Sequence, residues 1–243
     1  MSRALGPGLF VTGTDTGVGK TLVSCALVRA LRSRGIDAAA MKPIETGVGP
    51  AGPLDAIALR DAAGAVDALA DVCPQQFALP AAPSVAAAAE NRVVELESIA
   101  SAFARLGAGR DLVVAEGAGG LLVPIAERFT MLDLARWLGL PTLVVARAAL
   151  GTINHTLLTL QAAAASELPV IGVVISHAGG ELSAADAANL AALRGELAGR
   201  LLGEVPALTA AERVPSETLD LDRVIDALRA ESARMTQLDD ATR

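Results

Sequence analysis

Short, continuously apolar runs that alternate with longer amphipathic stretches constrain the fold of this chain more than any other feature. The runs show almost no alternation of polar and apolar residues, which is typical of strands covered by helices on both faces. Strands that alternate with helices in this way predict an α/β domain with a mostly parallel sheet. Strands are predicted at residues 9–12, 38–41, 112–115, 142–146, 170–175 and 201–205. Helices are predicted at residues 20–34, 55–62, 94–106, 131–138, 152–166, 184–200 and 221–234.

The chain is expected to form one domain over residues 1–235, because 243 residues suit a single α/β domain. Residues 72–83 contain three prolines, and we expect an irregular excursion between helices there, not a domain linker. Residues 236–243 are polar and short, so a loose C-terminal tail is expected.

Composition excludes several classes of function. A net charge of −7 argues against nucleic acid as the main partner, because phosphate backbones need clustered Lys and Arg. Charges, Gly or Pro interrupt each apolar stretch before the roughly 20 residues that a bilayer requires, and the N-terminus lacks a secretory pattern. Cys25 and Cys73 lack the spacing of a zinc site or a disulfide framework. We therefore expect a cytoplasmic protein that binds neither nucleic acid nor membranes.

The first predicted strand is joined to the first predicted helix by a glycine-rich stretch, Gly13-Thr14-Asp15-Thr16-Gly17-Val18-Gly19-Lys20-Thr21. Its backbone N–H groups and the positive end of the helix can surround phosphates, while Lys20 reaches the transferred group and Thr21 binds Mg²⁺. The first glycine stands one residue further from Gly-Lys-Thr than in the usual motif, and such a turn can also serve packing alone. With Lys and Thr in register, the stretch predicts a P-loop NTPase fold that binds a nucleotide.

Lysine is scarce, since the chain holds two lysines and eighteen arginines. The second lysine, Lys42, follows the second predicted strand in Met41-Lys42-Pro43-Ile44-Glu45-Thr46-Gly47. Ligands of open parallel sheets bind beyond the carboxyl ends of strands, so Lys42 should lie beside the phosphate loop. An ammonium there can neutralise an anionic intermediate, although a surface lysine before a proline turn would have the same sequence. The scarcity of lysine elsewhere favours a functional role.

Two carboxylates could complete a metal site with Thr21. Asp55 opens a short predicted helix, and Glu116 ends a predicted strand next to Gly117 and Gly119. Mg²⁺ prefers hard oxygen ligands and takes one or two carboxylates together with phosphate and water. Taken singly, Asp55 could be a helix N-cap and Glu116 could bond to backbone amides.

A further anion site is possible where Leu150-Gly151-Thr152-Ile153-Asn154-His155 begins a long predicted helix. Free N–H groups at a helix N-terminus favour a carboxylate or a phosphate. Without further information, a Thr or Asn cap is the simpler interpretation. His155 and His177 lack a partner pattern for general-base or metal chemistry, so no such chemistry is assigned to them.

With these motifs in this order, the chain resembles the dethiobiotin synthetase family over residues 9–206. Several independent motifs at compatible distances make the resemblance specific, whereas any one of them would be weak. The resemblance implies a homodimeric ligase that converts 7,8-diaminononanoate, CO2 and ATP into dethiobiotin, ADP and phosphate. An amine takes up CO2 as a carbamate, ATP phosphorylates it to a carbamic-phosphoric anhydride, and the second amine displaces phosphate. Each step adds negative charge, which accounts for two lysines and Mg²⁺.

The same resemblance assigns roles residue by residue. Lys20 would contact the transferring phosphoryl group, Lys42 would stabilise the carbamate as a catalytic residue, and Thr46 would lie beside the substrate. Mg²⁺ would be held by Thr21, Asp55 and Glu116. The phosphates would be lined by Gly17, Val18, Gly19, Lys20, Thr21, Leu22, Glu116, Gly117, Ala118 and Gly119. The distal substrate carboxylate would be bound across the subunit interface by Gly151, Thr152, Ile153 and Asn154.

The base of the nucleotide is where this chain departs from the family. The best-known members read adenine with an Asn-Asp pair after the fifth core strand, whereas this chain has Ser176 and His177 there. Another nucleoside triphosphate could therefore serve. Pro206, Ala207 and Leu208 resemble the other base-contacting loop of the family.

Three alternatives remain at the level of sequence. Amidoligases of the cobyrinic acid diamide synthase type share the P-loop and the glycine-rich acidic turn, but they usually carry a glutaminase domain. A nucleotide switch of the partitioning type has a signature lysine five residues before the loop lysine, where this chain has Asp15. An inert α/β domain would leave the motifs unexplained.

Overall fold

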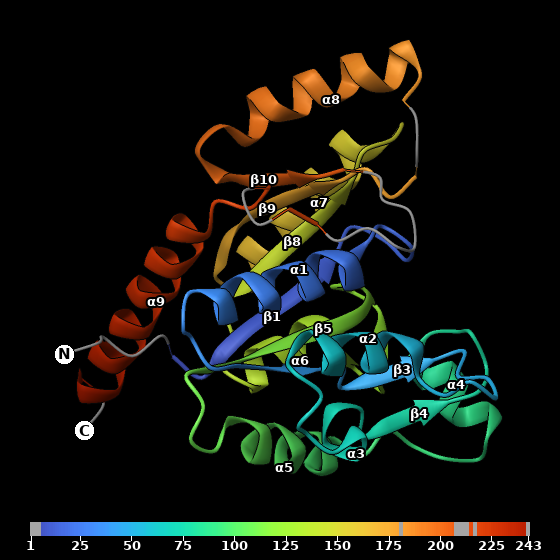
Figure 1. Ribbon diagram of the computed structural model, residues 1–243. Helices are drawn as coiled ribbons and strands as arrows, with labels where there is room; N and C mark the ends of the chain where they lie inside the picture. Colours follow the sequence, from blue (N-terminus) through green and yellow to red (C-terminus); the bar gives the residue numbers. More distant parts are fainter. Residues whose placement is uncertain (1–5, 180–181, 207–213, 216–217, 242–243) are drawn as a thin grey trace.

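Six parallel strands form the central sheet in the order β10-β9-β8-β1-β5-β2 (Figure 1). The structure is a computed structural model that describes residues 6–179, 182–206, 214–215 and 218–241. The sequence analysis predicted all six strands. Their ends agree to within a few residues, except that β5 was expected to end at Ala115 and continues to Gly120. Their bounds are β1 (Gly8–Gly13), β2 (Ala38–Met41), β5 (Leu112–Gly120), β8 (Thr142–Arg147), β9 (Val170–Ser176) and β10 (Leu201–Val205).

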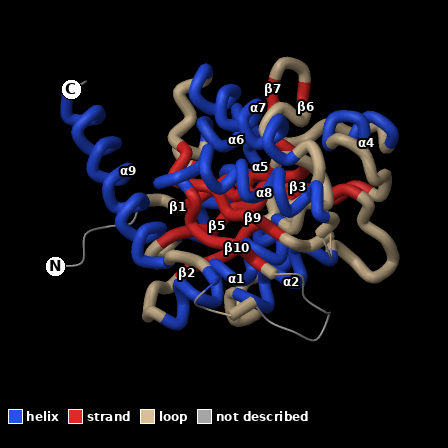
Figure 2. Tube along the Cα trace, turned by 90° about the horizontal axis from the view of Figure 1, so that it is seen from above, coloured by secondary structure: helices blue, strands red, loops and turns tan. Residues whose placement is uncertain are grey.

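Helices cover both faces of the sheet (Figure 2), as the continuously apolar strands predicted. One face packs against α1 (Lys20–Ser33), α2 (Leu54–Ala62) and α9 (Leu221–Ala241). The other face packs against α5 (Leu96–Gly107), α6 (Met131–Trp137), α7 (Thr152–Ala165) and α8 (Ala184–Leu197), which a 3₁₀ turn (Ala198–Arg200) extends. Successive strand residues divide between the faces: Leu9 and Val11 contact the α1 side, and Phe10 contacts the α5 side.

Several short elements between β2 and α6 were not predicted. They are β3 (Ile44–Thr46), α3 (Leu69–Val72), β4 (Gln75–Phe77), α4 (Pro83–Ala89), β6 (Pro124–Ala126) and β7 (Phe129–Thr130). β3 and β4 pair in parallel as a separate two-stranded sheet, so the stretch expected to be irregular contains an ordered strand. Strands of three residues are too short for hydrophobic periodicity to reveal them.

The C-terminal helix is longer than the sequence predicted. It was expected to end at Arg234 before a loose tail, but α9 continues through residues 235–241. Most side chains in its last described turns are exposed, so the apolar spacing that predicted the helix fades there. Ion pairs at i,i+3 between Asp226 and Arg229 and between Glu231 and Arg234 lie along it. Among the described helices, none has the length and apolarity needed to cross a membrane.

The strand order reverses at β1, because β5 and β2 lie on one side of it and β8, β9 and β10 on the other. Ligands of open α/β sheets bind in the crevice at such a point, outside the carboxyl ends of the strands. The glycine-rich turn follows β1 and Lys42 follows β2, while Glu116 lies on β5 beside Val11 of β1. The topology therefore brings the three main motifs to one edge of the sheet.

Candidate active site

A cavity of about 580 Å³ lies at the carboxyl ends of β1, β2 and β5. It is lined by the glycine-rich turn, the loop after β2, the first turn of α2, the end of β5, and residues 80–83, which lead into α4. Both lysines of the chain line it. Among the residues with predicted roles, it is lined by Gly17, Gly19, Lys20, Thr21, Lys42, Thr46, Asp55, Glu116, Ala118 and Gly119.

The glycine-rich turn has a backbone that requires glycine. Gly19, the residue just before α1, has φ of +93°, and an added Cβ would collide with the hydroxyl of Ser176. In the described structure no side chain caps α1, so its first N–H groups remain available to a phosphate. Ser176 thus packs under the turn, which is a structural reason for a small residue there.

Three of the predicted phosphate-lining residues also have a packing role. Val18 is fully buried in the core, and Leu22 packs against the same cluster. A Cβ on Gly117 would lie 2.8 Å from the ring of Phe10, so this glycine lets β5 pass a large core side chain.

Lys20 lies in the turn with its ammonium directed at the backbone. Its Nζ donates to the carbonyl oxygen of Asp15 at 2.9 Å, and its exposed fraction is 7%. Burial and the nearby charge of Lys42 lower the pKa of Lys20 to about 8. A bound phosphate would reverse that effect, because an opposite charge favours the protonated amine.

Lys42 is held between two carboxylates. Its Nζ donates to Glu116 Oε1 at 2.6 Å and to Asp55 Oδ2 at 2.7 Å. The side chains of Lys42 and Glu116 are 4% and 0% exposed, whereas that of Asp55 is 43% exposed. Burial alone would lower the pKa of Lys42, but Glu116 and Asp55 outweigh it and raise the pKa well above its usual value. The contacts with Glu116 and Asp55 therefore favour the protonated form of Lys42.

Glu116 also connects this pair to the glycine-rich turn. The hydroxyl of Thr21 donates to Glu116 Oε1 at 2.8 Å, so the three residues predicted to hold Mg²⁺ form one cluster with Lys42. Glu116 Oε2 is buried and has no hydrogen-bond partner among the described residues. Burial would raise the pKa of Asp55, but Lys42 and Thr21 overcome that effect and keep the pKa below its usual value.

Two carboxylates and a hydroxyl suit Mg²⁺ when phosphate and water complete its coordination. The orphaned Glu116 Oε2 is consistent with a cluster that carries more negative charge than its donors satisfy. In the described part of the chain, no group of three or more His, Cys, Asp or Glu could hold a metal ion. A metal bound by Thr21, Asp55 and Glu116 would complete its coordination with water or with phosphate oxygens.

Glu45 positions Asp55, and the sequence analysis gave it no role. Its two carboxylate oxygens accept from the backbone N–H groups of Asp55 at 3.0 Å and of Ala56 at 2.9 Å. Glu45 thus caps the first turn of α2, where Pro53 offers no capping side chain. Burial raises the pKa of Glu45, and these two N–H donors oppose that effect without cancelling it. The sequence did offer a signal for this role. It has an acidic residue directly before Thr46, and the next helix along the chain starts after a proline.

Arg147 is a second residue that the sequence analysis missed. It ends β8, and its guanidinium lies 3.3 Å from Asp15 Oδ2 in the glycine-rich turn. Asp15 stands where a partitioning-type switch has its signature lysine, and here it forms an ion pair within the chain.

The predicted base-contacting residues lie at the ends of β9 and β10. His177 Nε2 is 3.1 Å from Glu204 Oε2, and Arg194 donates to both oxygens of that carboxylate. His177 therefore has a carboxylate partner that the sequence pattern did not reveal. Pro206 follows β10, and Ala207 and Leu208 lie outside the described residues.

The turn from Gly151 to Asn154 starts α7, and Gly151 has φ of +85°. No side chain caps this helix in the described structure, so its first N–H groups are available to an anion. The turn is not part of the described lining of the cavity within one chain. Leu150, just before it, is 75% exposed.

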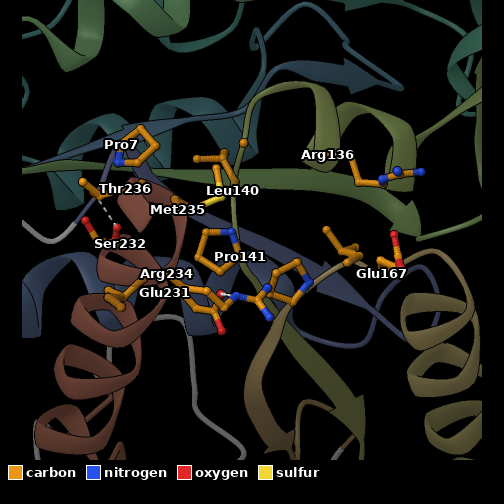
Figure 3. A pocket seen from close by; sticks show the side chains of 16 residues that line it. Pro7, Arg136, Leu140, Pro141, Glu167, Glu231, Ser232, Arg234, Met235 and Thr236 are labelled. Atoms are coloured by element: carbon orange, nitrogen blue, oxygen red, sulfur yellow. Dashed lines mark hydrogen bonds and ion pairs between the residues drawn. The ribbon is translucent and has the colours of Figure 1, made fainter. Parts of the chain in front are cut away.

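A larger cavity of about 1000 Å³ lies at the opposite edge of the sheet (Figure 3). Its lining comes from the amino ends of β1, β8 and β9 and from one side of α9. Neither lysine nor the glycine-rich turn reaches it. Both lysines and the glycine-rich turn therefore line the smaller cavity and not this one.

Comparison with solved structures supports the fold. The chain is similar to the MinC:MinD cell division protein complex of Aquifex aeolicus, with a TM-score of 0.51, 14% identity and 96% of each chain covered. It is also similar to the cell division protein FtsY of Thermotoga maritima, with a TM-score of 0.51 and 18% identity over 94% of this chain and 71% of that one. At such identities the likeness concerns the P-loop α/β fold alone.

Comparison with families and curated proteins goes further. A family model described as an AAA domain matches residues 7–214. The ATP-dependent dethiobiotin synthetase of Anaeromyxobacter dehalogenans strain 2CP-C is 53% identical over 189 residues, 75% of this chain and 85% of the relative. That of Aromatoleum aromaticum is 40% identical over 207 residues, 84% of this chain and 92% of the relative. With these relatives and the site in place, the chain belongs to the ATP-dependent dethiobiotin synthetases, and it is a ligase with a P-loop fold.

Proposed function

We propose that this chain closes the cyclic urea of dethiobiotin from 7,8-diaminononanoate, CO2 and ATP in the cavity that both lysines line. The observation that carries the proposal is the cluster in which Lys42 lies 2.6 Å from Glu116 and 2.7 Å from Asp55. That cluster stands beside a phosphate-binding turn with its own lysine. A cavity built only for nucleotide hydrolysis would not need a second buried cation after a different strand.

Nucleotide binding is assigned to the turn between β1 and α1. The free N–H groups at the start of α1 would face the phosphates, and Lys20 would leave the carbonyl of Asp15 to contact the transferring phosphoryl group. The pKa of Lys20 is lowered in the free protein, so bound phosphates, which favour the protonated amine, would also determine the charge of Lys20. Gly119 and Ala118 would line the same phosphates from β5.

Carbamate chemistry is assigned to the loop after β2. One amine of the substrate attacks CO2, loses a proton and becomes a carbamate. The carbamate oxygen attacks the terminal phosphorus of ATP, and the bond from that phosphorus to ADP breaks. The second amine then attacks the carbamoyl carbon, phosphate leaves with the carbamate oxygen, and a second proton is lost. Lys42 would stabilise the negative charge of the carbamate, and Thr46, which lines the cavity, would position it.

Thr21, Asp55 and Glu116 are the residues that would hold Mg²⁺, which would supply positive charge to the transferring phosphates. Glu45 would keep Asp55 in place through the first turn of α2. Burial of Glu116 under the turn fixes the carboxylate that joins Thr21 to Lys42.

The distal carboxylate of the substrate is assigned to the N-terminus of α7 in a second copy of the chain. In one chain, this turn lies outside the described lining of the cavity, while its N–H groups are available and Leu150 beside it is exposed. A homodimer that places the turn of one protomer at the cavity of its partner would complete the site. The enzyme would act in the cytoplasm, where its small-molecule substrates are found.

Phosphate release in the presence and absence of each substrate tests this proposal. We expect release to require diaminononanoate and bicarbonate together, with one dethiobiotin formed for each phosphate and identified by mass spectrometry. Omission of either substrate should stop it. Phosphate release that continues when either substrate is left out would favour a simple ATPase and overturn the proposal.

A further inference from the structure

One oxygen of the Glu116 carboxylate, Oε1, already accepts two hydrogen bonds from the cluster. This oxygen accepts from the Thr21 hydroxyl at 2.8 Å and from the Lys42 ammonium at 2.6 Å. A carboxylate oxygen has two lone pairs, so both acceptor directions of Oε1 are in use. The other oxygen, Oε2, is buried from solvent. Although Oε2 has no hydrogen-bond partner, its burial means that a cation entering from the cavity finds no accessible lone pair on Glu116 until one donor leaves Oε1.

The two donors differ in what they can share with a cation. The Thr21 hydroxyl has lone pairs of its own, so it can keep donating its proton to Glu116 while its oxygen binds a metal. The Lys42 ammonium has three protons, no acceptor and a positive charge. A cation on Thr21 and Glu116 would repel it at close range. Lys42 is therefore the donor that must give way.

Asp55 leads to the same conclusion from the other side. Its Oδ2 is bonded to Lys42 at 2.7 Å, so Lys42 bridges both carboxylates that would bind the metal. The side chain of Lys42 is 4% exposed, and its ammonium occupies the position between the carboxylates where a cation would be best placed. Lys20 makes no comparable contact in the described structure, because its Nζ donates to a backbone carbonyl.

We infer that Lys42 and the divalent cation compete for Asp55 and Glu116, so that metal binding releases Lys42 toward the carbamate. The inference deepens the proposed function and rests on its assignment of the metal to Thr21, Asp55 and Glu116. Without metal, the ammonium neutralises one of the two carboxylate charges and stays bound between them. A divalent cation neutralises both, and the flexible stem of Lys42 then carries its charge into the cavity. The catalytic lysine becomes available only when the metal is present.

Binding of Mn²⁺ to the nucleotide-free protein tests the competition, because Mn²⁺ also prefers oxygen ligands and its free form is quantified by electron paramagnetic resonance. We expect Lys42→Met to bind Mn²⁺ at least about tenfold more tightly than the natural protein, which corresponds to about 1.4 kcal/mol. Lys20→Met is the matched control, since it removes the same charge from the same cavity without removing a carboxylate contact. Its effect should be clearly smaller. An unchanged affinity in Lys42→Met, or an equal gain in Lys20→Met, would overturn the competition.

A labelling experiment on the natural protein gives an answer that does not depend on a variant folding. Reductive methylation of the nucleotide-free protein, followed by mass spectrometry, reports on Lys20 and Lys42 separately because the chain has no other lysine. We expect Mg²⁺ alone to accelerate methylation of Lys42 several-fold while the rate at Lys20 changes little. A rate at Lys42 that stays the same or falls would mean that the metal and the ammonium bind together, contrary to the inference.

These results separate the inference from the proposed function. Turnover with diaminononanoate and bicarbonate could be normal while Mn²⁺ affinity is indifferent to Lys42, in which case only the competition is wrong. If turnover requires neither substrate but the affinities change as expected, the competition stands and the assigned reaction is wrong.

Discussion

Lys42 is the residue whose environment departs most from what a short sequence motif can show. The sequence placed it near the phosphate loop, and the structure adds that two carboxylates hold it in a buried position. The contact with Glu116 could be expected only in part, because it depends on β5 lying between β1 and β2. Glu45 was missed because its partners are backbone N–H groups ten and eleven residues ahead in the chain.

Replacement of Lys42 by Ala should abolish ring closure and leave nucleotide binding within a few-fold of normal. The reason is that Lys42 would neutralise the carbamate under the proposed function, and a single electrostatic donor of this kind contributes on the order of 100-fold or more in kcat. Lys42→Arg keeps the charge but replaces a compact ammonium with a planar fork, so it should restore little activity. Steady-state turnover and equilibrium nucleotide binding check this. Retained turnover in Lys42→Ala would remove the residue from the mechanism.

Nucleotide binding should take up a proton at alkaline pH through Lys20. Burial and Lys42 hold the pKa of Lys20 at about 8 in the free protein, and phosphates would raise it. Well below that pH, Lys20 is already protonated in both states and uptake is absent. As the pH rises through about 8, the free form loses its proton and the bound form keeps it, so uptake increases. Calorimetry in buffers of different ionisation enthalpy measures the uptake, and Lys20→Met should eliminate it. Uptake that falls with rising pH would contradict this environment for Lys20.

Among the elements, long ones were predicted and short ones were not. The six strands of the central sheet and seven helices follow from apolar runs and amphipathic stretches that are long enough to repeat. β3, β4 and α3 have three or four residues each, and tertiary contacts decide their structure. The last part of α9 belongs to a long helix, but it was missed because its exposed side chains carry no apolar pattern.

The first turn of α2 should depend on Glu45. Glu45→Ala leaves the N–H groups of Asp55 and Ala56 without their acceptors, and losing a cap of this kind costs about 1–2 kcal/mol of stability. The control is Glu97→Ala, which removes an exposed acid from the first turn of α5 and should cost only a few tenths of a kcal/mol. Urea unfolding of both variants compares the two losses. Equal losses would show that Glu45 does not stabilise the start of α2.

At the scale of the whole molecule, the sequence predicted the parallel sheet, its two helical layers and the gathering of motifs at one edge. This worked because parallel topology places all strand ends of one kind together, whatever the details of the loops. The part that could not be predicted is which residues of the loops contact one another, because the insertion between β2 and β5 forms its own small sheet and brings residues 80–83 to the cavity.

Dimerisation should control substrate affinity if the α7 turn of one protomer serves its partner. Leu150 is 75% exposed beside that turn, and Leu150→Asp should weaken the dimer and raise the KM for diaminononanoate. Nucleotide affinity should remain unchanged, since the glycine-rich turn belongs to the same chain as both lysines. The control is Val66→Asp, at a residue 70% exposed in the loop between α2 and α3. Sedimentation and kinetics measure both effects, and a weakened dimer with a normal KM would refute the shared site.

Transfer of oxygen from CO2 to phosphate tests the central claim most directly. If the carbamate attacks ATP, the oxygen that bridges carbon and phosphorus comes from CO2 and leaves with phosphate. A rapid-quench experiment with ¹⁸O-labelled CO2 should therefore place one labelled oxygen in each phosphate released, as read by mass spectrometry. Phosphate without label, formed at the rate of turnover, would mean that water attacks ATP and that no acyl phosphate forms between Lys20 and Lys42.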